Sequence, residues 1–481
     1  MPPEPKRRFA GRTPMRSLLR FRDERTGASS TELRDVAGGK RVDVEALAAY
    51  LCQDAPLDPA RTFYRDVRNE LLPGVWRIGP KGPAFERRAR DEHEAAERVR
   101  TVLTHVIEHA IGDCRRVAVF ASGGLDSSVV MALAAEIMAR KGGSLFALAI
   151  DFESPGDDRP HLAALEAHLK CEVIRIAPRG GAPYVEQVRT GVDAAPMLWP
   201  FSPLQLALFA AARAHGAERI ITGVGGDDFF DGSPRALAGL LGRDPRTAVV
   251  RARALEGFDP VRFPVLEYLV RPLVVPLVPI ALRRARARRT LRPLQRLPWA
   301  GPKLREVATA LAARNLETTL AGVTQREPRA KFALPGNRFF AWLLHQEQRA
   351  GMLDRYDPMF TEEVADVLAT IPADMLLAGN RWKGLLRECA RAKLPESLLN
   401  RLDKADFAPA FPPFLEAVGG LDAFAEELEG RSLAKLGLAD PSRFRAEIGA
   451  ALQAPQQDGR YGYAWAALAA EAFLMRHPEV L

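Results

Sequence analysis

Short apolar runs alternate with longer amphipathic segments through the first half of the chain. The apolar runs are nearly continuous and end at polar or glycine-rich clusters, as buried strands do; they cover residues 116–121, 144–152, 171–177 and 219–224. Apolar residues recur with helical spacing between these runs, over residues 127–143, 159–170 and 202–217. This alternation predicts a parallel sheet with helices on both faces, and therefore the α/β fold class.

The segments around this core follow other patterns. Residues 1–40 are basic and contain Gly, Ser and Thr, so we predict irregular structure there. Helical spacing predicts helices at 42–51 and 91–113, and a small hairpin is predicted at 73–88. After residue 233 the pattern is almost entirely helical. The chain is therefore divided into a short N-terminal segment (1–92), an α/β core (93–233) and a helical remainder (234–481).

Length and cysteine content limit the class of protein. A chain of 481 residues is too long for one ordinary core, so more than one domain is expected. The four cysteines have no CxxC spacing and no neighbouring His pair, which indicates thiols in a reducing compartment. The basic N-terminus lacks the apolar segment of a secretory signal. We therefore expect a cytoplasmic protein.

One stretch, residues 264–282, is more apolar than the rest of the chain. It contains Glu267, Arg271 and several prolines, which disfavour a membrane-spanning helix. We therefore expect no membrane partner.

The formal net charge of the chain is +8, and two basic clusters contribute to it. One lies at residues 6–25, and the other consists of Arg283, Arg284, Arg286, Arg288, Arg289, Arg292 and Arg296. Such clusters can bind nucleic acid or an acidic substrate, and a solvated surface is the alternative. No aromatic residues interleave the second cluster, so a single-stranded nucleic acid is disfavoured.

The motif SGGLDSS (residues 122–128) follows the first strand of the core. Its two glycines let backbone N–H groups approach a ligand, and the next helix directs its positive N-terminus to the same place. This makes an anion cradle, although the GxxxxGK pattern of a Walker loop is missing. A bare phosphate would repel Asp126, so we expect Asp126 to bind a Mg²⁺ ion that bridges to phosphates. The alternative is an ordinary strand-to-helix turn capped by Asp and Ser.

A second motif, IITGVGGDDFFDG (residues 220–232), also follows a strand. Ligands of parallel α/β sheets bind at the carboxyl ends of the strands, so both motifs are expected to face one site. Asp227 and Asp228 are adjacent, and only one of them is expected to face a metal ion shared with Asp126. The two motifs together predict a site for a nucleotide and magnesium.

These motifs resemble those of a known family. SGGLDSS is similar to the signature of the PP-loop ATP pyrophosphatases, and its combination with TGVGGDDFFDG resembles the synthetase domain of asparagine synthetase and its relatives. These include the β-lactam synthetases and the lasso-peptide macrocyclases, and the GxGGD and DKADF forms look most like the macrocyclases. The resemblance runs over residues 42–415 and includes TFYRDVRNELLPGVWRI, DDRPHLAALEAHL and RWKGLLRECARAKLPESLLNRLDKADFAPAF.

The resemblance implies a sheet of the adenine-nucleotide α-hydrolase type and an adenylating reaction. ATP would transfer AMP to a substrate carboxylate with loss of pyrophosphate, and an amine would then attack the acyl-adenylate to form an amide. Asp126 and Asp227 would hold Mg²⁺, Lys404 would stabilise charge at the activated carboxyl, and Lys383 would contact a phosphate; surface lysines are the alternative for both. The residues implied around ATP are Ser122, Gly123, Gly124, Asp126, Ser127 and Ser128 at the pyrophosphate end and Phe120, Ile150, Thr222 and Gly223 near the adenosine.

Two departures from the family pattern change the expected function. Asparagine synthetases carry a glutaminase whose nucleophile is the cysteine after the initiator Met, whereas position 2 here is Pro2, so we expect no hydrolysis of glutamine. The relatives have Glu or Tyr where this chain has Val224, which cannot accept a proton from the attacking amine. Asp354 lies near a second acidic position of the relatives and is the candidate for that work, with a surface carboxylate as the alternative.

The predicted function is an ATP-dependent, AMP-forming carboxylate–amine ligase. Its substrate would be a small-molecule or peptide carboxylate, and a separate protein would bind a leader peptide or supply ammonia. One alternative is an ammonia-dependent asparagine synthetase. Another is a tRNA-modifying PP-loop enzyme, which the basic clusters favour and the second motif opposes. A binding subunit without turnover is the third, and the intact motifs oppose it.

Overall fold

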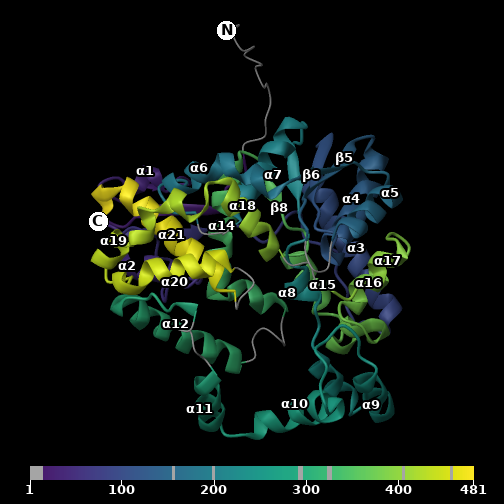
Figure 1. The fold of residues 1–481 in the computed structure, drawn as a ribbon. Helices are drawn as coiled ribbons and strands as arrows, with labels where there is room; N and C mark the ends of the chain where they lie inside the picture. The colour runs from purple at the N-terminus through teal and green to yellow at the C-terminus, as the bar shows by residue number, and fades with distance from the viewer. Residues whose placement is uncertain are drawn as a thin grey trace.

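A five-stranded parallel sheet forms the centre of the computed structural model (Figure 1). The structure describes residues 15–153, 158–197, 201–290, 296–321, 328–403, 407–454 and 459–481. The strand order is β6-β5-β4-β7-β8. The strands are β4 (Arg116–Phe120), β5 (Ser144–Ile150), β6 (Val173–Ile176), β7 (Arg219–Ile221) and β8 (Arg355–Tyr356).

Helices cover both faces of this sheet, as the alternating pattern predicted. Successive strand residues point to opposite faces, so Ala118, Phe146 and Ile220 pack with helix α7, while Val117 and Val119 belong to the core shared with α3 and α4. The helices of this α/β core are α3 (Glu92–Ile111), α4 (Leu125–Lys141), α5 (Arg159–Leu169) and α7 (Ser202–Ala214). The α/β fold class is confirmed.

The order of the strands places one crevice at the centre of the sheet. From β4 the chain moves outward through β5 to β6, then returns to pair β7 with the other edge of β4. The direction of winding therefore reverses between β4 and β7, and ligands bind at such a switch point beyond the carboxyl ends of the strands. The two glycine-rich motifs are the loops that leave these two strands.

The N-terminal segment contains more regular structure than the sequence predicted. An antiparallel sheet is formed by β1 (Leu19–Asp23), β2 (Ser29–Ser30) and β3 (Val67–Leu71). Between β2 and β3 the chain forms two helices, α1 (Arg34–Ala37) and α2 (Val44–Leu51). The prediction of irregular structure up to residue 40 is therefore wrong over β1 to α1. Charged residues hid the strand, because Arg20 and Arg22 alternate with the buried Leu19 and Phe21.

The predicted hairpin at residues 73–88 is also wrong, since this described stretch contains no strand. Its backbone is anchored to a helix instead: the N–H groups of Ile78 and Gly79 donate to Oε1 of Glu363 at 3.1 and 3.2 Å. Nearby, the Trp76 ring packs edge-on against Phe360 at 5.2 Å. The turn residues that suggested a hairpin belong instead to a loop that packs against α15 (Glu362–Leu368).

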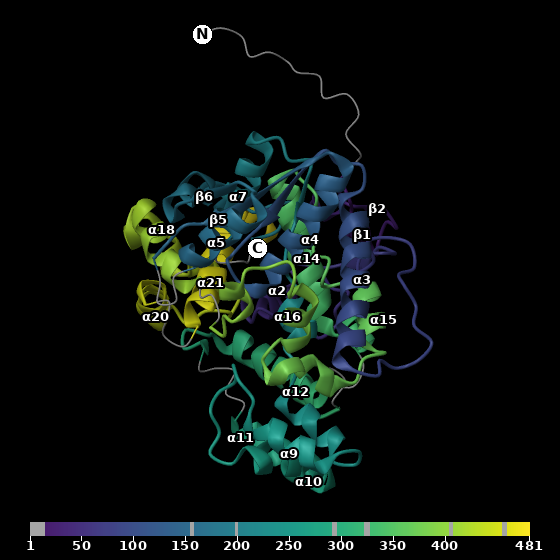
Figure 2. The ribbon, with the colours of Figure 1, turned by 90° about the vertical axis from the view of Figure 1, so that its right-hand side faces the viewer.

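The rest of the described chain is mostly helical, as predicted after residue 233, with β8 as the exception. Its α-helices are α6 (Val185–Thr190), α8 (Gly226–Phe230), α9 (Pro245–Arg253), α10 (Arg271–Val274), α11 (Ile280–Thr290), α12 (Pro302–Ala321), α14 (Pro335–Gly351), α15 (Glu362–Leu368), α16 (Gly384–Ala390), α17 (Glu396–Leu399), α18 (Phe411–Ala417), α19 (Arg431–Lys435), α20 (Pro441–Gln453) and α21 (Arg460–Arg476). Figures 1 and 2 both place α9, α10 and α11 together at one end of the molecule, away from the sheet. Among the described helices, none has the length and apolar character needed to cross a bilayer.

Candidate active site

The loops that follow β4 and β7 touch through two glycines. A Cβ atom placed on Gly223 would lie 2.5 Å from the backbone N of Ser127, and one placed on Gly226 would lie 2.1 Å from Cγ of Asp126. Real Cβ atoms do not approach other atoms this closely, so glycine at position 223 lets the two backbones touch, and glycine at position 226 makes room for the Asp126 carboxylate. The two motifs therefore form one site, as the sequence predicted.

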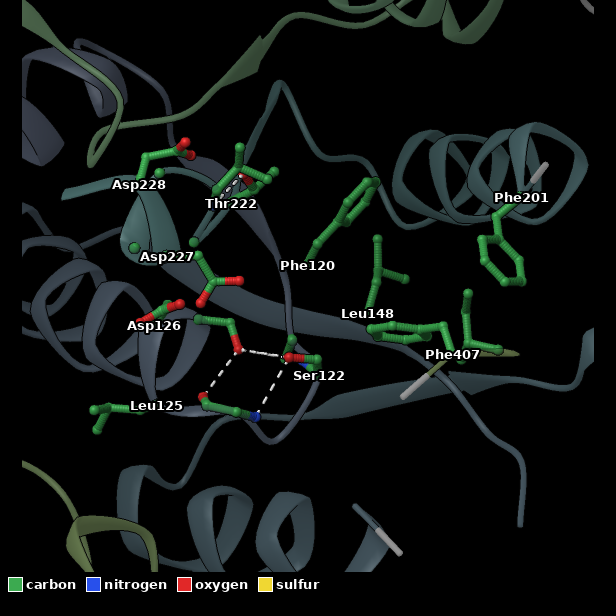
Figure 3. A pocket seen from close by; sticks show the side chains of 18 of the residues that line it. Phe120, Ser122, Leu125, Asp126, Leu148, Phe201, Thr222, Asp227, Asp228 and Phe407 are labelled. Atoms are coloured by element: carbon green, nitrogen blue, oxygen red, sulfur yellow. Dashed lines mark hydrogen bonds between the residues drawn. The ribbon is translucent and has the colours of Figure 1, made fainter. Parts of the chain in front are cut away.

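The serines of the first loop fix its shape. Oγ of Ser128 donates to the Gly124 carbonyl at 2.8 Å, and Oγ of Ser127 donates to the same carbonyl at 3.2 Å. Oγ of Ser127 also accepts from the backbone N–H of Ser122 at 3.2 Å (Figure 3). Within the described chain, no side chain caps the helix α4 that follows. Its first N–H groups are therefore available to an anion such as a phosphate.

A buried lysine joins the acidic residues of the two loops. Nζ of Lys383, whose side chain is only 2% exposed, lies 2.5 Å from Oδ2 of Asp126 and 2.6 Å from Oδ1 of Asp227. Burial raises the pKa of Asp126 to about 6, although the charge of Lys383 opposes this shift. Burial would lower the pKa of Lys383, but the two carboxylates outweigh it and raise that pKa. The lysine therefore stays charged and neutralises one of the two acids.

The same carboxylates fit a magnesium ion. Oδ1 of Asp126 is buried and has no hydrogen-bond partner, which leaves it open to a cation. Mg²⁺ usually binds one or two carboxylates and completes its shell with water and phosphate oxygens. The described residues contain no group of three or more candidate metal ligands. Asp126 and Asp227 would therefore share the ion with the phosphates of a nucleotide.

A cavity of about 570 Å³ lies between the two loops. Its apolar part is lined by Phe120, Leu148 and Ile150 at the strand ends and by Leu208 of α7. Figure 3 shows the rings of Phe201 and Phe407 on the side of the cavity away from Asp126, and their centroids are 6.4 Å apart. An apolar pocket beside an anion cradle has the chemistry that an adenine base and its phosphates require.

Arg401 connects the first loop to the segment that carries Lys404. Its guanidinium donates to the Gly123 carbonyl at 3.0 Å and pairs with Asp158 at 2.6 Å and Asp403 at 3.1 Å. The side chain is 2% exposed, and these acids raise its pKa against the effect of burial. Gly123 has a φ of +72°, a backbone conformation that favours glycine. Arg401 thus holds the turn of the phosphate loop in place through the Gly123 carbonyl.

A buried polar network supports the second loop. The hydroxyl of Thr222 donates to Oδ1 of Asp357, which also accepts from Nε of Arg355 at 3.1 Å. Arg355 pairs with the buried carboxylate of Glu347 as well. The network keeps the Thr222 hydroxyl bound beneath the loop, and Arg355 is among the residues that line the cavity.

Most of the residues predicted from the sequence meet at this cavity. Those that line it are Phe120, Ser122, Gly124, Asp126, Ser127, Ile150, Thr222, Gly223, Asp227 and Lys383. Gly123 and Ser128 do not line it, and they shape the loop as described above. Lys404 lies outside the described residues, whereas its neighbours Asp403 and Phe407 line the cavity.

The structure does not bring Asp354 to the cavity. Asp354 precedes β8 and lies at the amino end of that strand, whereas the cavity lies at the carboxyl ends. Its backbone carbonyl accepts from Ile220 at 2.9 Å, and its Oδ1 accepts from the backbone N–H of Arg16 at 2.9 Å. Asp357, at the other end of the strand, is the acid that contacts the second loop.

Several lining residues were missed from the sequence. They include Gln205, Arg355, Arg401, Asp403 and Tyr461. Arg401 and Asp403 come just before Lys404 in the sequence, so the motif that pointed to Lys404 could also have pointed to them. Nothing in the local sequence marks Gln205 or Tyr461, because both lie on helices that reach the cavity only through packing.

Comparison with known families agrees with the geometry. The profile of the family described as asparagine synthase matches residues 98–475, a range that includes both loops, Lys383 and Arg401. The chain belongs to the asparagine synthase family. This member is accordingly an ATP-dependent amide ligase of the asparagine synthase type. A search of curated proteins finds no match.

Proposed function

We propose that this asparagine synthase family member forms amides through an acyl-adenylate. The adenine of ATP would occupy the apolar part of the cavity, with its phosphates over the N-terminus of α4. The substrate carboxylate would attack the α-phosphorus and release pyrophosphate; an amine would then attack the carbonyl carbon and release AMP. The observation that carries this proposal is the meeting of an uncapped helix N-terminus, a buried lysine and an apolar pocket in one cavity.

The residues of the chain would act mainly by binding and by stabilising charge. Lys383 would balance the negative charge that develops on the departing pyrophosphate. Asp126 and Asp227 would hold Mg²⁺, which supplies further positive charge at the phosphates. Lys404 would stabilise the charge that develops at the activated carboxyl, and Arg401 would keep its segment beside the phosphate loop.

The proposed substrate is a peptide or biosynthetic intermediate rather than free aspartate. Val224 lines the cavity and has no group that can accept a proton from the amine, and Asp354 lies at the other end of its strand. Proton transfer by Glu or Tyr, which we expect in the asparagine and β-lactam synthetases, therefore has no counterpart at these two positions. The aromatic side chains of Phe201, Phe407 and Tyr461 suit a substrate with apolar groups next to its carboxylate.

A partner protein and a cytoplasmic location belong to the same proposal. An external amine or a peptide substrate would be delivered by a protein that supplies ammonia or binds a leader peptide, and nucleic acid has no place in this scheme. The four cysteines are all free thiols, which supports a reducing compartment.

Release of pyrophosphate from Mg·ATP tests the adenylation step. We would offer L-aspartate with ammonium and, separately, candidate peptides that carry an amine and a side-chain carboxyl. We expect no turnover with aspartate, and with the correct peptide a product lighter by one water. Asp126→Asn is the control and should abolish release with every substrate. Pyrophosphate release that Asp126→Asn leaves unchanged would refute the proposed site.

The second candidate function is an ammonia-dependent asparagine synthetase, which the family match favours. The same assay decides between the two, because this candidate requires AMP, pyrophosphate and asparagine from aspartate and ammonium. That outcome would also show that the enzyme does not need a proton acceptor at position 224.

A further inference from the structure

Exposed apolar side chains gather at one end of the molecule. The described chain has thirteen large hydrophobic residues with exposed side chains, and ten of them lie between residues 250 and 282. These ten are Val250, Phe263, Leu266, Val270, Leu273, Val274, Val275, Leu277, Ile280 and Leu282. They belong to the end formed by α9, α10 and α11, which we call the distal lobe (residues 245–290; Figures 1 and 2). Contiguous exposed apolar residues mark a surface that another component covers.

Six of these residues form a stripe with helical spacing. Their separations along the chain alternate between three and four positions, and they extend from Phe263, before the π-helix, through α10 and a 3₁₀-helix to the first residue of α11. Their exposed fractions lie between 41% and 81%, and the six are Phe263, Leu266, Val270, Leu273, Leu277 and Ile280. Beneath the first part of the stripe, Tyr268 and Leu269 join a small core with Leu237 and Leu240, whereas no residue of α10 or of the 3₁₀-helix is buried. The stripe is therefore anchored at its start and exposed over the rest of its length.

The same region carries the excess positive charge of the chain. Residues 260–296 contain nine arginines and one glutamate, a formal charge of +8 that equals the net charge of all 481 residues. The rest of the chain is therefore neutral overall. Arg286 is exposed on α11, directly after the apolar stripe, while Arg271 pairs with Glu267 at 2.6 Å within the lobe. Arg284 pairs with Glu317 of α12 at 2.6 Å, so the apolar residues adjoin a positive charge that acidic residues compensate only in part.

We propose that the distal lobe docks on the surface of a membrane that contains anionic lipids. Interfacial elements bury an apolar face at the level of the headgroups while neighbouring arginines attract anionic lipids. Two copies of the lobe would repel each other, because residues 245–290 contain ten arginines and only three acidic residues. A partner helix also fits poorly, since the stripe passes from a π-helix (Leu266–Val270) through α10 into a 3₁₀-helix (Val275–Leu277). Such changes break the regular ridges that helix packing requires, whereas a fluid bilayer follows them.

This inference departs from the expectation that no membrane is involved. That expectation rested on Glu267, Arg271 and the prolines, which exclude a spanning helix and do not exclude an element that lies in the interface. The inference does not depend on the proposed function, because the lobe shares no residue with the cavity. Docking of the lobe would hold the enzyme at the membrane surface without involving the residues that line the cavity.

Co-sedimentation of the full chain with vesicles tests the proposal. We expect binding to vesicles of phosphatidylcholine with phosphatidylglycerol, little binding to phosphatidylcholine alone, and loss of binding as salt rises. The double variants Leu273→Glu/Leu277→Glu and Arg283→Gln/Arg286→Gln should each weaken binding by roughly tenfold or more. Leu57→Glu is the matched control: Leu57 is 42% exposed but lies outside the lobe, so its variant should bind as the wild type does.

Several outcomes would overturn the inference. One is equal binding to both kinds of vesicle, and another is binding that survives Leu273→Glu/Leu277→Glu. Absence of vesicle binding together with capture of polyglutamate would assign the lobe to an acidic polypeptide instead. Unchanged thermal unfolding of the variants shows that a loss of binding is not a loss of fold.

Discussion

Nζ of Lys383 lies 2.5 Å from Oδ2 of Asp126, so a lysine from the helical remainder neutralises the phosphate loop of the α/β core. We expect Lys383→Met to lower pyrophosphate release by roughly a hundredfold or more, because Asp126 and Asp227 then face the phosphates without a positive partner. Lys393→Met is the control, since Lys393 pairs with Glu136 and does not line the cavity. A Lys383→Met enzyme with normal turnover would remove the lysine from the mechanism.

The stability of the metal-free enzyme should depend on the ionisation of Asp126. Its pKa is about 6 in the folded chain against an ordinary value of 3.8, so folding favours the protonated form. This contribution is fully present below pH about 4 and is lost as the pH rises through about 6. Between about pH 5 and about pH 7 the free energy of unfolding of the wild type should fall by about 1 kcal/mol relative to Asp126→Asn. Urea unfolding of both proteins in the presence of a chelator measures this, and parallel pH profiles would contradict it.

The contact between the two loops predicts a strict requirement at Gly226. A methyl group there would lie 2.1 Å from Cγ of Asp126, so Gly226→Ala must displace the Asp126 carboxylate that is proposed to bind Mg²⁺. We expect Gly226→Ala to lose at least about 99% of pyrophosphate release, as misplaced reacting groups do. Gly239→Ala is the matched control, because a Cβ at Gly239 meets no atom within 4 Å. Equal activity of the two variants would show that the loops need not touch.

Arg401 should act as a positioning residue rather than at the reacting atoms. Arg401→Ala leaves the Gly123 carbonyl and Asp158 without their shared partner, so the KM for ATP should rise about tenfold or more. Arg401→Lys keeps the positive charge but lacks the planar guanidinium group, so it should recover only part of the affinity for ATP. Steady-state kinetics with both variants provides the measurement, with the exposed Arg391→Ala as control. A fall in kcat with an unchanged KM would instead place Arg401 at the reaction itself.

Asp354→Asn tests whether Asp354 accepts a proton in catalysis, as the sequence suggested, or lies away from the reaction, as its position at the amino end of β8 indicates. Asp354 accepts from the backbone of Arg16 at the amino end of β8, so pyrophosphate release should stay within about twofold of the wild type. Asp357→Asn, at the carboxyl end, removes the negative charge that pairs with the buried Arg355 beneath the second loop and should lower activity. The reverse ranking of the two variants would restore the catalytic role of Asp354.

The central sheet was predictable because each of four strands is a nearly continuous apolar run. The short strand β8 was not, since two residues, Arg355 and Tyr356, carry no periodic pattern. This also explains the difference between Asp354 and Asp357: without the strand, nothing in the sequence tells which of the two acids lies at its carboxyl end. The N-terminal strands were missed for another reason, because their charged outward positions dominate the local composition.

The site was predictable where strand ends carry glycine and acidic residues in one motif. The cluster around Lys383 depends on contacts between segments more than 150 residues apart, and local spacing contains no information on such contacts. The distal lobe shows a second limit of prediction from the sequence. Helical spacing of apolar residues normally predicts a buried face, and only the packing reveals that the stripe from Phe263 to Ile280 is left uncovered.

The cavity is lined by residues from Phe120 near the start of the sheet to Tyr461 on the last long helix. A polypeptide emerges from the ribosome N-terminus first, so the phosphate loop is made long before the residues that enclose it. As synthesis proceeds, the chain first gains Lys383 beside Asp126, then the contact of Arg401 with the phosphate loop, and after that the wall of the cavity provided by Tyr461. The enzyme therefore gains the means to consume ATP only after Tyr461 has been synthesised.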